Sequence, residues 1–206
     1  MDSGMSFQDH FDAAFCINLD KRTDRWKLSQ KQFNKIDLEV ERISAVDGFQ
    51  EPAASIRPGE VGCLKSHLKV FELAKERGLK SFLMLEDDVE FSDTFHERFN
   101  IIEPQIKPYE MLYFGSNPHS GERHEVTPNL NRITYTFAAH CVIFKEPCYD
   151  EIINALKGPL LLPVDVVYGK QQVTHTAYSI KPALAWQRKD FSDINQEIVD
   201  YQFLRA

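Results

Sequence analysis

Residues 82–85 form a continuously apolar run, FLML, that ends at three consecutive acidic residues, Glu86, Asp87 and Asp88. A short run without polar alternation indicates a strand covered on both faces, as in the centre of a sheet flanked by helices. Ligands of open α/β sheets bind beyond the carboxyl ends of the strands. The three carboxylates therefore fall where such a sheet places its ligand site.

The rest of the chain alternates strand and helix patterns, which predicts an α/β fold. The clearest helix covers residues 59–77, because Val61, Leu64, Leu68 and Phe71 recur at helical spacing and Gly78 stands at the C-terminal cap position. Other predicted helices are 22–36, one capped by Ser92, and 147–156; predicted strands are 13–19, 38–43, 111–114, 138–144 and 175–180. Residues 159–169 show no regular pattern. We expect a flexible lead-in over 1–12 and a single domain over 13–206.

Composition excludes several classes of protein. The formal net charge of -7 does not fit a nucleic-acid-binding protein, which usually carries a basic face. No stretch is long and apolar enough for a membrane span or a signal peptide, so we expect a cytoplasmic protein, or a domain of a larger one. The four cysteines form no C-x-x-C pair, and Cys16, Cys63 and Cys141 fit small buried apolar side chains.

The acidic strand end is a candidate site for a divalent cation. Three adjacent carboxylates repel one another at the edge of an apolar core, and Mg²⁺ or Mn²⁺ relieves that repulsion with its preference for oxygen ligands. Strand alternation places Glu86 and Asp88 on one face and Asp87 on the other, unless the chain bends there. We expect Asp88 to bind the metal directly and Glu86 to assist through water or the nucleotide. A solvated acidic turn is the alternative.

Five short segments, in order, resemble glycosyltransferase family 25, which includes lipopolysaccharide glycosyltransferases and procollagen galactosyltransferases. The segments are CINLDKRTDR at 16–25, GCLKSH at 62–67, LEDDV at 85–89, PVD at 163–165, and PALAWQ at 182–187 followed by SDI at 192–194. The resemblance implies a GT-A-type fold, that is, a single Rossmann-like domain with a mixed central sheet flanked by helices. It also implies inverting transfer of a hexose, galactose or glucose, from a UDP-sugar with Mn²⁺ or Mg²⁺.

On this resemblance, residues of about 13–115 bind the donor, and about 116–206 bind a glycan or hydroxylysine-type acceptor. Asn18, Arg22 and Arg25 follow the first strand and are candidates for the nucleotide and its diphosphate. An exposed basic helix turn is the alternative for the arginines. Asp47 and Gly48 are candidates for the nucleoside, since glycine permits a close backbone approach; a plain turn is the alternative.

The resemblance also assigns Ser66, His67, Gln187, Glu86 and Asp87 to the donor site, although a lone helical histidine is more often structural. An inverting transfer needs a carboxylate that takes the proton of the acceptor hydroxyl. Asp165 is the first candidate for this base and Asp193 the second; a hydrogen bond to the sugar is the alternative role for either.

Four further residues have functional and structural interpretations. His140 and His175 are candidates for a third metal ligand, but structural hydrogen bonding is the more common role. Tyr113 and Trp186 are candidates for stacking on a sugar or base, but aromatic residues in apolar strands usually belong to the core.

Two other functions also fit the bare acidic cluster. A metal-dependent nucleotidyltransferase uses carboxylates and a cation, although the sequence has no G-x-x-x-x-G-K-[ST] phosphate loop. A catalytically degenerate nucleotide-sugar-binding module is the non-enzymatic alternative.

Overall fold

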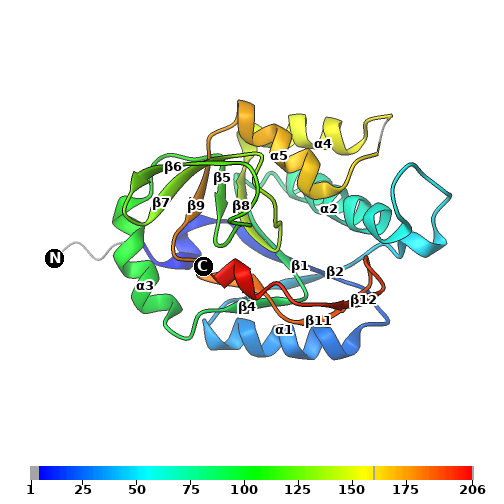
Figure 1. Ribbon diagram of the computed structural model, residues 1–206, viewed down its shortest axis with the longest axis horizontal. Helices are drawn as coiled ribbons and strands as arrows, with labels where there is room; N and C mark the ends of the chain where they lie inside the picture. Colours follow the sequence, from blue (N-terminus) through cyan, green and yellow to red (C-terminus); the bar gives the residue numbers. More distant parts are fainter. Residues whose placement is uncertain (1–4, 160, 206) are drawn as a thin grey trace.

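The computed structural model describes residues 5–159 and 161–205. Its centre is an eight-stranded mixed sheet between two layers of helices (Figure 1), which confirms the predicted α/β class. The strand order is β2-β1-β3-β8-β5-β9-β7-β6. The strands are β1 (Ala13–Asn18), β2 (Glu41–Ser44), β3 (Ser81–Glu86), β5 (Met111–Tyr113), β6 (Glu122–Thr127), β7 (Leu130–Thr134), β8 (Cys141–Lys145) and β9 (Ala177–Ile180).

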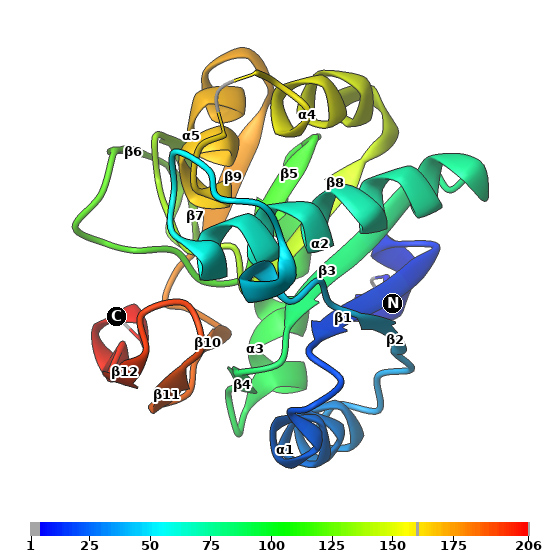
Figure 2. The ribbon, with the colours of Figure 1, turned by 90° about the vertical axis from the view of Figure 1, so that its right-hand side faces the viewer.

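The helices cover both faces of the sheet. One face packs against α2 (Pro58–Glu76), α4 (Tyr149–Leu156) and α5 (Val164–Thr174). The other packs against α1 (Thr23–Lys35) and α3 (Phe95–Ile102), and the two layers are seen in Figure 2.

Strand β3 shows why its sequence lacks polar alternation. Phe82 and Met84 point into the core beneath α2, whereas Leu83 and Leu85 point into the core beneath α1 and α3. All four side chains are fully buried. The prediction of a central strand covered on both faces is therefore confirmed.

Helix α2 has the predicted sequence boundaries to within a residue. It begins at Pro58, whose fixed φ suits the first helical position, and Glu60 completes a capping box with Arg57. Gly78, just beyond the last turn, has a φ of +66°, a conformation that favours glycine. This long helix holds the 62–67 segment against the sheet.

The sheet topology gathers the site. Because β3 is parallel to β1 and antiparallel to β8, Asn18, Glu86 and the residues before Cys141 meet at one edge. Beyond this edge, β4 (Val89–Phe91) pairs with β10 (Ala185–Gln187), and β11 (Asp190–Ser192) pairs with β12 (Glu197–Val199). These small strands bring the C-terminal segment back over the acidic strand end.

Several elements differ from the sequence expectations. Asp165 lies in the first turn of α5, within a stretch that has no regular sequence pattern, because buried Val164, Val167 and Tyr168 stabilise the helix. Helix α3 begins after Thr94 rather than after Ser92, whose Oγ accepts a hydrogen bond from the Thr94 N–H. The β6–β7 hairpin is missed because β6 is an edge strand with mostly exposed residues.

The lead-in also needs a correction where the structure describes it. Residues 1–4 and 160 lie outside the described residues. Phe7–His10 form a 3₁₀ helix, and the Phe7 ring packs against Phe95, Phe99 and Phe114. Burial of this one aromatic ring joins the segment to the core, a contact that a polar stretch does not reveal.

Candidate functional site

A cavity of about 390 Å³ opens at the carboxyl edge of the sheet. It is lined by residues from the β1 and β3 ends, the start of α2, the start of α5 and the C-terminal segment. Of the predicted site residues, it contains Asn18, Arg25, Asp47, Gly48, Ser66, Glu86, Asp87, Asp88, Asp165, Gln187 and Asp193. Arg22 and His67, which were also predicted to bind the donor, do not line it.

The chain bends at the acidic strand end, so simple alternation fails. Strand β3 stops at Glu86, and Asp87 and Asp88 form a turn before β4. Both aspartates point to Arg25, with Nη2 lying 2.9 Å from Asp87 Oδ1 and 2.8 Å from Asp88 Oδ2. The bend is the exception that the sequence analysis allowed, so the alternation that would place Glu86 and Asp88 on one face does not apply.

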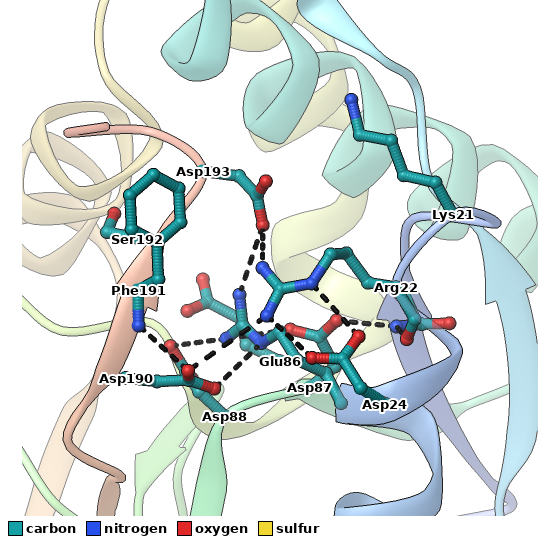
Figure 3. Close-up of polar contacts among 12 residues, drawn as sticks. Lys21, Arg22, Asp24, Glu86, Asp87, Asp88, Asp190, Phe191, Ser192 and Asp193 are labelled. Carbon is teal, nitrogen blue, oxygen red and sulfur yellow. Dashed lines mark hydrogen bonds and ion pairs between the residues drawn. The ribbon is translucent and has the colours of Figure 1, made fainter. Parts of the chain in front are cut away.

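Arg22, which precedes α1, contacts the C-terminal segment (Figure 3). Arg25 in α1 connects the strand end to that segment. Arg22 forms an ion pair with Asp193, and its guanidinium also binds Asp24. Arg25 lies 3.6 Å from an Asp190 oxygen and 3.7 Å from an Asp193 oxygen. Arg25 is only 7% exposed, so the alternative interpretation from the sequence, an exposed basic helix turn, does not hold for this residue.

Burial and charge set the proton affinities of this cluster. Burial, with Asp88 adding to it, raises the pKa of Glu86 to about 8. Burial raises the pKa of Asp87 to about 6, against the opposing effect of Arg25. Burial alone lowers the pKa of Arg25, but Asp88 and Asp87 outweigh it and the guanidinium stays charged.

The Asn18 side chain forms hydrogen bonds around the acidic cluster. Its Nδ2 donates to Asp87 Oδ2 at 2.6 Å and to the Arg22 carbonyl at 3.1 Å, and its Oδ1 accepts from Arg42 Nε at 2.8 Å. The amide is thus bonded within the protein, and it fixes the orientation of Asp87.

The Asp47–Gly48 turn packs closely on helix α2. A Cβ on Gly48 would lie 1.7 Å from the Pro58 carbonyl oxygen, so glycine is required there for helix packing. The Ser66 Oγ accepts from the Val46 N–H at 2.8 Å and holds the same turn. Asp47 forms an ion pair with Lys21 at 2.7 Å. These residues shape one wall of the cavity.

Asp165 and Gln187 enter the cavity from the later half of the chain. The Asp165 carboxylate accepts the backbone N–H groups of Ala138 and Ala139, while burial and Glu86 raise its pKa to about 6. Gln187 Nε2 lies 3.4 Å from Glu86 Oε2. Asp193 also lines the cavity, but Arg22 and Arg25 already engage its carboxylate. Asp165 is therefore better placed than Asp193 to accept a proton.

The Asp88 side chain fits a divalent cation. Its Oδ1 atom is buried and accepts no hydrogen bond from any described residue, although Oδ2 binds Arg25. An orphaned carboxylate oxygen beside further carboxylates is the donor set that Mn²⁺ or Mg²⁺ binds.

The four other candidates have structural partners. His140 Nε2 lies 3.2 Å from the Ala185 carbonyl oxygen. His175 lies between Glu110 and Glu151, neither of which lines the cavity. Tyr113 OH accepts from Gln172, and Trp186 Nε1 donates to Glu90 at 3.0 Å. The structural interpretation holds for these contacts.

Sequence reasoning missed several residues of the cavity wall, including Lys21, Phe49, Arg57, Asn117 and Tyr201. Cys63 was assigned to the core by its apolar neighbours, but it lies half-buried in the lining. Helical spacing offers a signal in this case, because Cys63 and His67 are four residues apart and share a face of α2.

The raised pKa of Glu86 predicts a stability change with pH in the metal-free protein. Between about pH 6.5 and 8, folded Glu86 holds a proton that the unfolded chain, with an ordinary pKa of 4.5, has lost. We therefore expect the free energy of unfolding to fall by about 1.5 kcal/mol as the pH rises through this window. His67, with a pKa lowered by burial to about 4, stays neutral there. Urea titrations with a chelator present should show this slope in the wild type and not in Glu86→Gln; equal slopes would contradict the assignment.

The fold and the cavity define a class of protein: an α/β domain with a cavity beyond the carboxyl ends of its central strands, the place where such folds bind their ligands. The family model described as "Glycosyltransferase family 25 (LPS biosynthesis protein)" matches residues 11–187. The chain belongs to glycosyltransferase family 25. Among the described residues, no helix has the length and apolar character needed to cross a membrane.

Individual relatives align with only part of their length. Human "Procollagen galactosyltransferase 2" is 27% identical, and the alignment covers 79% of this chain and 31% of that protein. Human "Inactive glycosyltransferase 25 family member 3" is also 27% identical, with 75% and 31% covered. A solved glycosyltransferase involved in glycosylation of the major capsid of PBCV-1 has a TM-score of 0.43 at 9% identity, with 70% and 64% covered. This chain thus spans about a third of the length of the curated relatives.

Proposed function

We propose that this chain transfers a hexose from a nucleoside-diphosphate sugar to an acceptor hydroxyl group, with inversion at the sugar C1. The observation that carries the proposal is that Asp88, with its orphaned oxygen, and Asp165, with its raised pKa, line one cavity. Family membership supports sugar transfer. The name of the human relative supports galactose, with glucose the second choice, and UDP is the expected nucleotide.

The chain's own groups supply the proton transfer and the positioning. Asp165 takes the proton of the acceptor hydroxyl, whose oxygen forms a bond to C1 as the bond from C1 to the diphosphate oxygen breaks. The diphosphate leaves with that electron pair. Arg25, held against Asp88, adds positive charge beside it. Mn²⁺ or Mg²⁺ bound at Asp88 would supply Lewis-acid neutralisation of the departing diphosphate.

The acceptor is proposed to be a glycan, such as a lipopolysaccharide precursor, or a hydroxylysine-type hydroxyl. The later half of the chain contributes Asn117, Asp165 and Tyr201 to the cavity, and these residues are the candidates for acceptor contacts. Both acceptor types present a secondary or primary hydroxyl to the same base.

A screen of nucleotide-sugars for cation-dependent release of the nucleoside diphosphate tests the proposal. UDP-galactose and UDP-glucose are incubated with Mn²⁺, Mg²⁺ or a chelator, with and without acceptor. We expect release that Asp88→Asn abolishes and that Asp150→Asn leaves intact, because Asp150 is an exposed residue in the first turn of α4 that pairs with Lys75 and does not line the cavity. Full activity in a folded Asp88→Asn protein would overturn the role of Asp88.

The product separates the alternatives. Pyrophosphate instead of nucleoside diphosphate would indicate a nucleotidyltransferase. Tight donor binding without release would indicate a binding module, an outcome favoured by the fact that Arg25 already neutralises Asp87 and Asp88. The anomeric configuration of the product, measured by NMR, decides between inversion and retention.

A further inference from the structure

Three side chains with different ligand atoms converge at the cavity wall. The Cys63 sulfur, a His67 ring nitrogen and a Glu86 oxygen all lie within 4.8 Å of one another. Cys63 and His67 project from successive turns of α2, and Glu86 ends β3. Two rigid elements thus present the three groups to one point.

His67 has one nitrogen bonded and one left over. The side chain is fully buried, and Nδ1 lies 2.7 Å from Tyr168 OH. The other ring nitrogen, Nε2, makes no hydrogen bond with any described residue. The distance from Nε2 to Glu86 Oε1 is 3.4 Å. A buried polar atom without a partner is costly, whereas a metal-binding histidine typically has its second nitrogen fixed by a hydrogen bond in this way.

The three ligand atoms of this cluster (sulfur, nitrogen and oxygen) differ from the carboxylate oxygens around Asp88. Sulfur and imidazole ligands select zinc-like cations, while Mg²⁺ and Mn²⁺ prefer oxygen alone. The Glu86 side chain turns toward His67 and Gln187, whereas Asp88 turns toward Arg25. The two sites therefore call for different ions.

We propose that Cys63, His67 and Glu86 form a site for Zn²⁺ or a similar borderline-soft divalent cation. Three protein ligands leave a fourth tetrahedral position, which opens toward the cavity that Cys63 and Glu86 line. Tyr168 is the positioning residue that orients the imidazole. The site is independent of the proposed sugar transfer, because its ligands need neither nucleotide nor acceptor.

Cobalt substitution tests the site without any activity assay. Reduced, metal-stripped protein is titrated with Co²⁺ in excess Mg²⁺, which saturates oxygen-only sites. We expect one equivalent of Co²⁺ to produce a sulfur-to-cobalt charge-transfer absorption in the near ultraviolet, which one equivalent of Zn²⁺ then displaces. Absence of this absorption from folded protein would overturn the proposal.

Variants assign the ligands. Cys63→Ser should abolish the absorption and His67→Gln should weaken Zn²⁺ binding, while Tyr168→Phe should weaken it by roughly 10- to 100-fold. Cys148→Ala and His124→Gln, which alter a buried thiol and an exposed imidazole away from the cavity, should change neither readout. Equal absorption in wild type and Cys63→Ser would contradict the proposal, with circular dichroism confirming that each variant is folded. Zinc binding without sugar transfer would leave this proposal standing and remove the proposed function alone.

Discussion

Replacing Asp165 with asparagine is expected to lower the turnover number of sugar transfer about a thousandfold, within the usual range for loss of a general base. The carboxylate lines the cavity, and its raised pKa of about 6 suits proton transfer near neutral pH. Asp87 has a similar pKa, but Arg25 and Asn18 already engage its carboxylate. Donor binding, measured by calorimetry, should change little. In the wild type, the rate should rise with pH through about 6, and this acid limb should disappear in the variant.

Asp165 also holds the loop of Ala138, so a positional effect must be separated from loss of the base. Ala138 has a φ of +84°, a strained conformation for alanine that the Asp165 carboxylate helps to maintain. Ala138→Gly relieves the strain and serves as the matched control. If Asp165→Asn acts through the loop, the double variant will regain activity; if Asp193 is the base instead, Asp193→Asn will show the larger loss of turnover.

The sequence was most informative where a single element determines the structure. Residues 82–85 are all apolar, which by itself indicates a strand buried on both faces. Helix α2 has apolar residues at helical spacing, Pro58 at its start and Gly78 after its end. Such local signals located the strand end and the segment 62–67. The predicted residues converge on one cavity because parallel strands share an edge, a consequence of topology.

The parts that sequence could not supply depend on contacts distant in the chain. Asp87 and Asp88 turn to Arg25 because the chain bends into β4, whose partner strand β10 is about 100 residues away. Helix α5 forms on packing despite a central glycine, Gly169, which lies against Tyr135. The C-terminal segment that carries Asp190 and Asp193 also returns to Arg25, and no local sequence pattern predicts this return.

Arg25 acts as the built-in cation of the acidic strand end in the metal-free protein. Its guanidinium contacts Asp87 and Asp88 and lies near Asp190 and Asp193, so it joins β3, α1 and the C-terminal segment. A divalent ion at Asp88 would share these carboxylates with it. This arrangement predicts that the arginine and the ion substitute for each other in stabilising the fold.

Arg25→Met is therefore expected to lower the free energy of unfolding by about 3–5 kcal/mol, because it leaves buried carboxylates without a countercharge. For a chain of this size, the melting temperature should fall by roughly 10 °C. The matched control Arg77→Met removes an exposed ion pair with Glu41 and should cost at most about 1 kcal/mol.

Added Mn²⁺ should raise the melting temperature of Arg25→Met more than that of the wild type, since the ion then has the carboxylates to itself. The extra shift should vanish in the double variant Arg25→Met/Asp88→Asn, which lacks the proposed ligand. Calorimetric scans at matched Mn²⁺ concentrations measure both effects. Equal Mn²⁺ shifts in wild type and Arg25→Met would show that the arginine and the ion occupy separate sites, and the cation would then have to be placed away from Asp88.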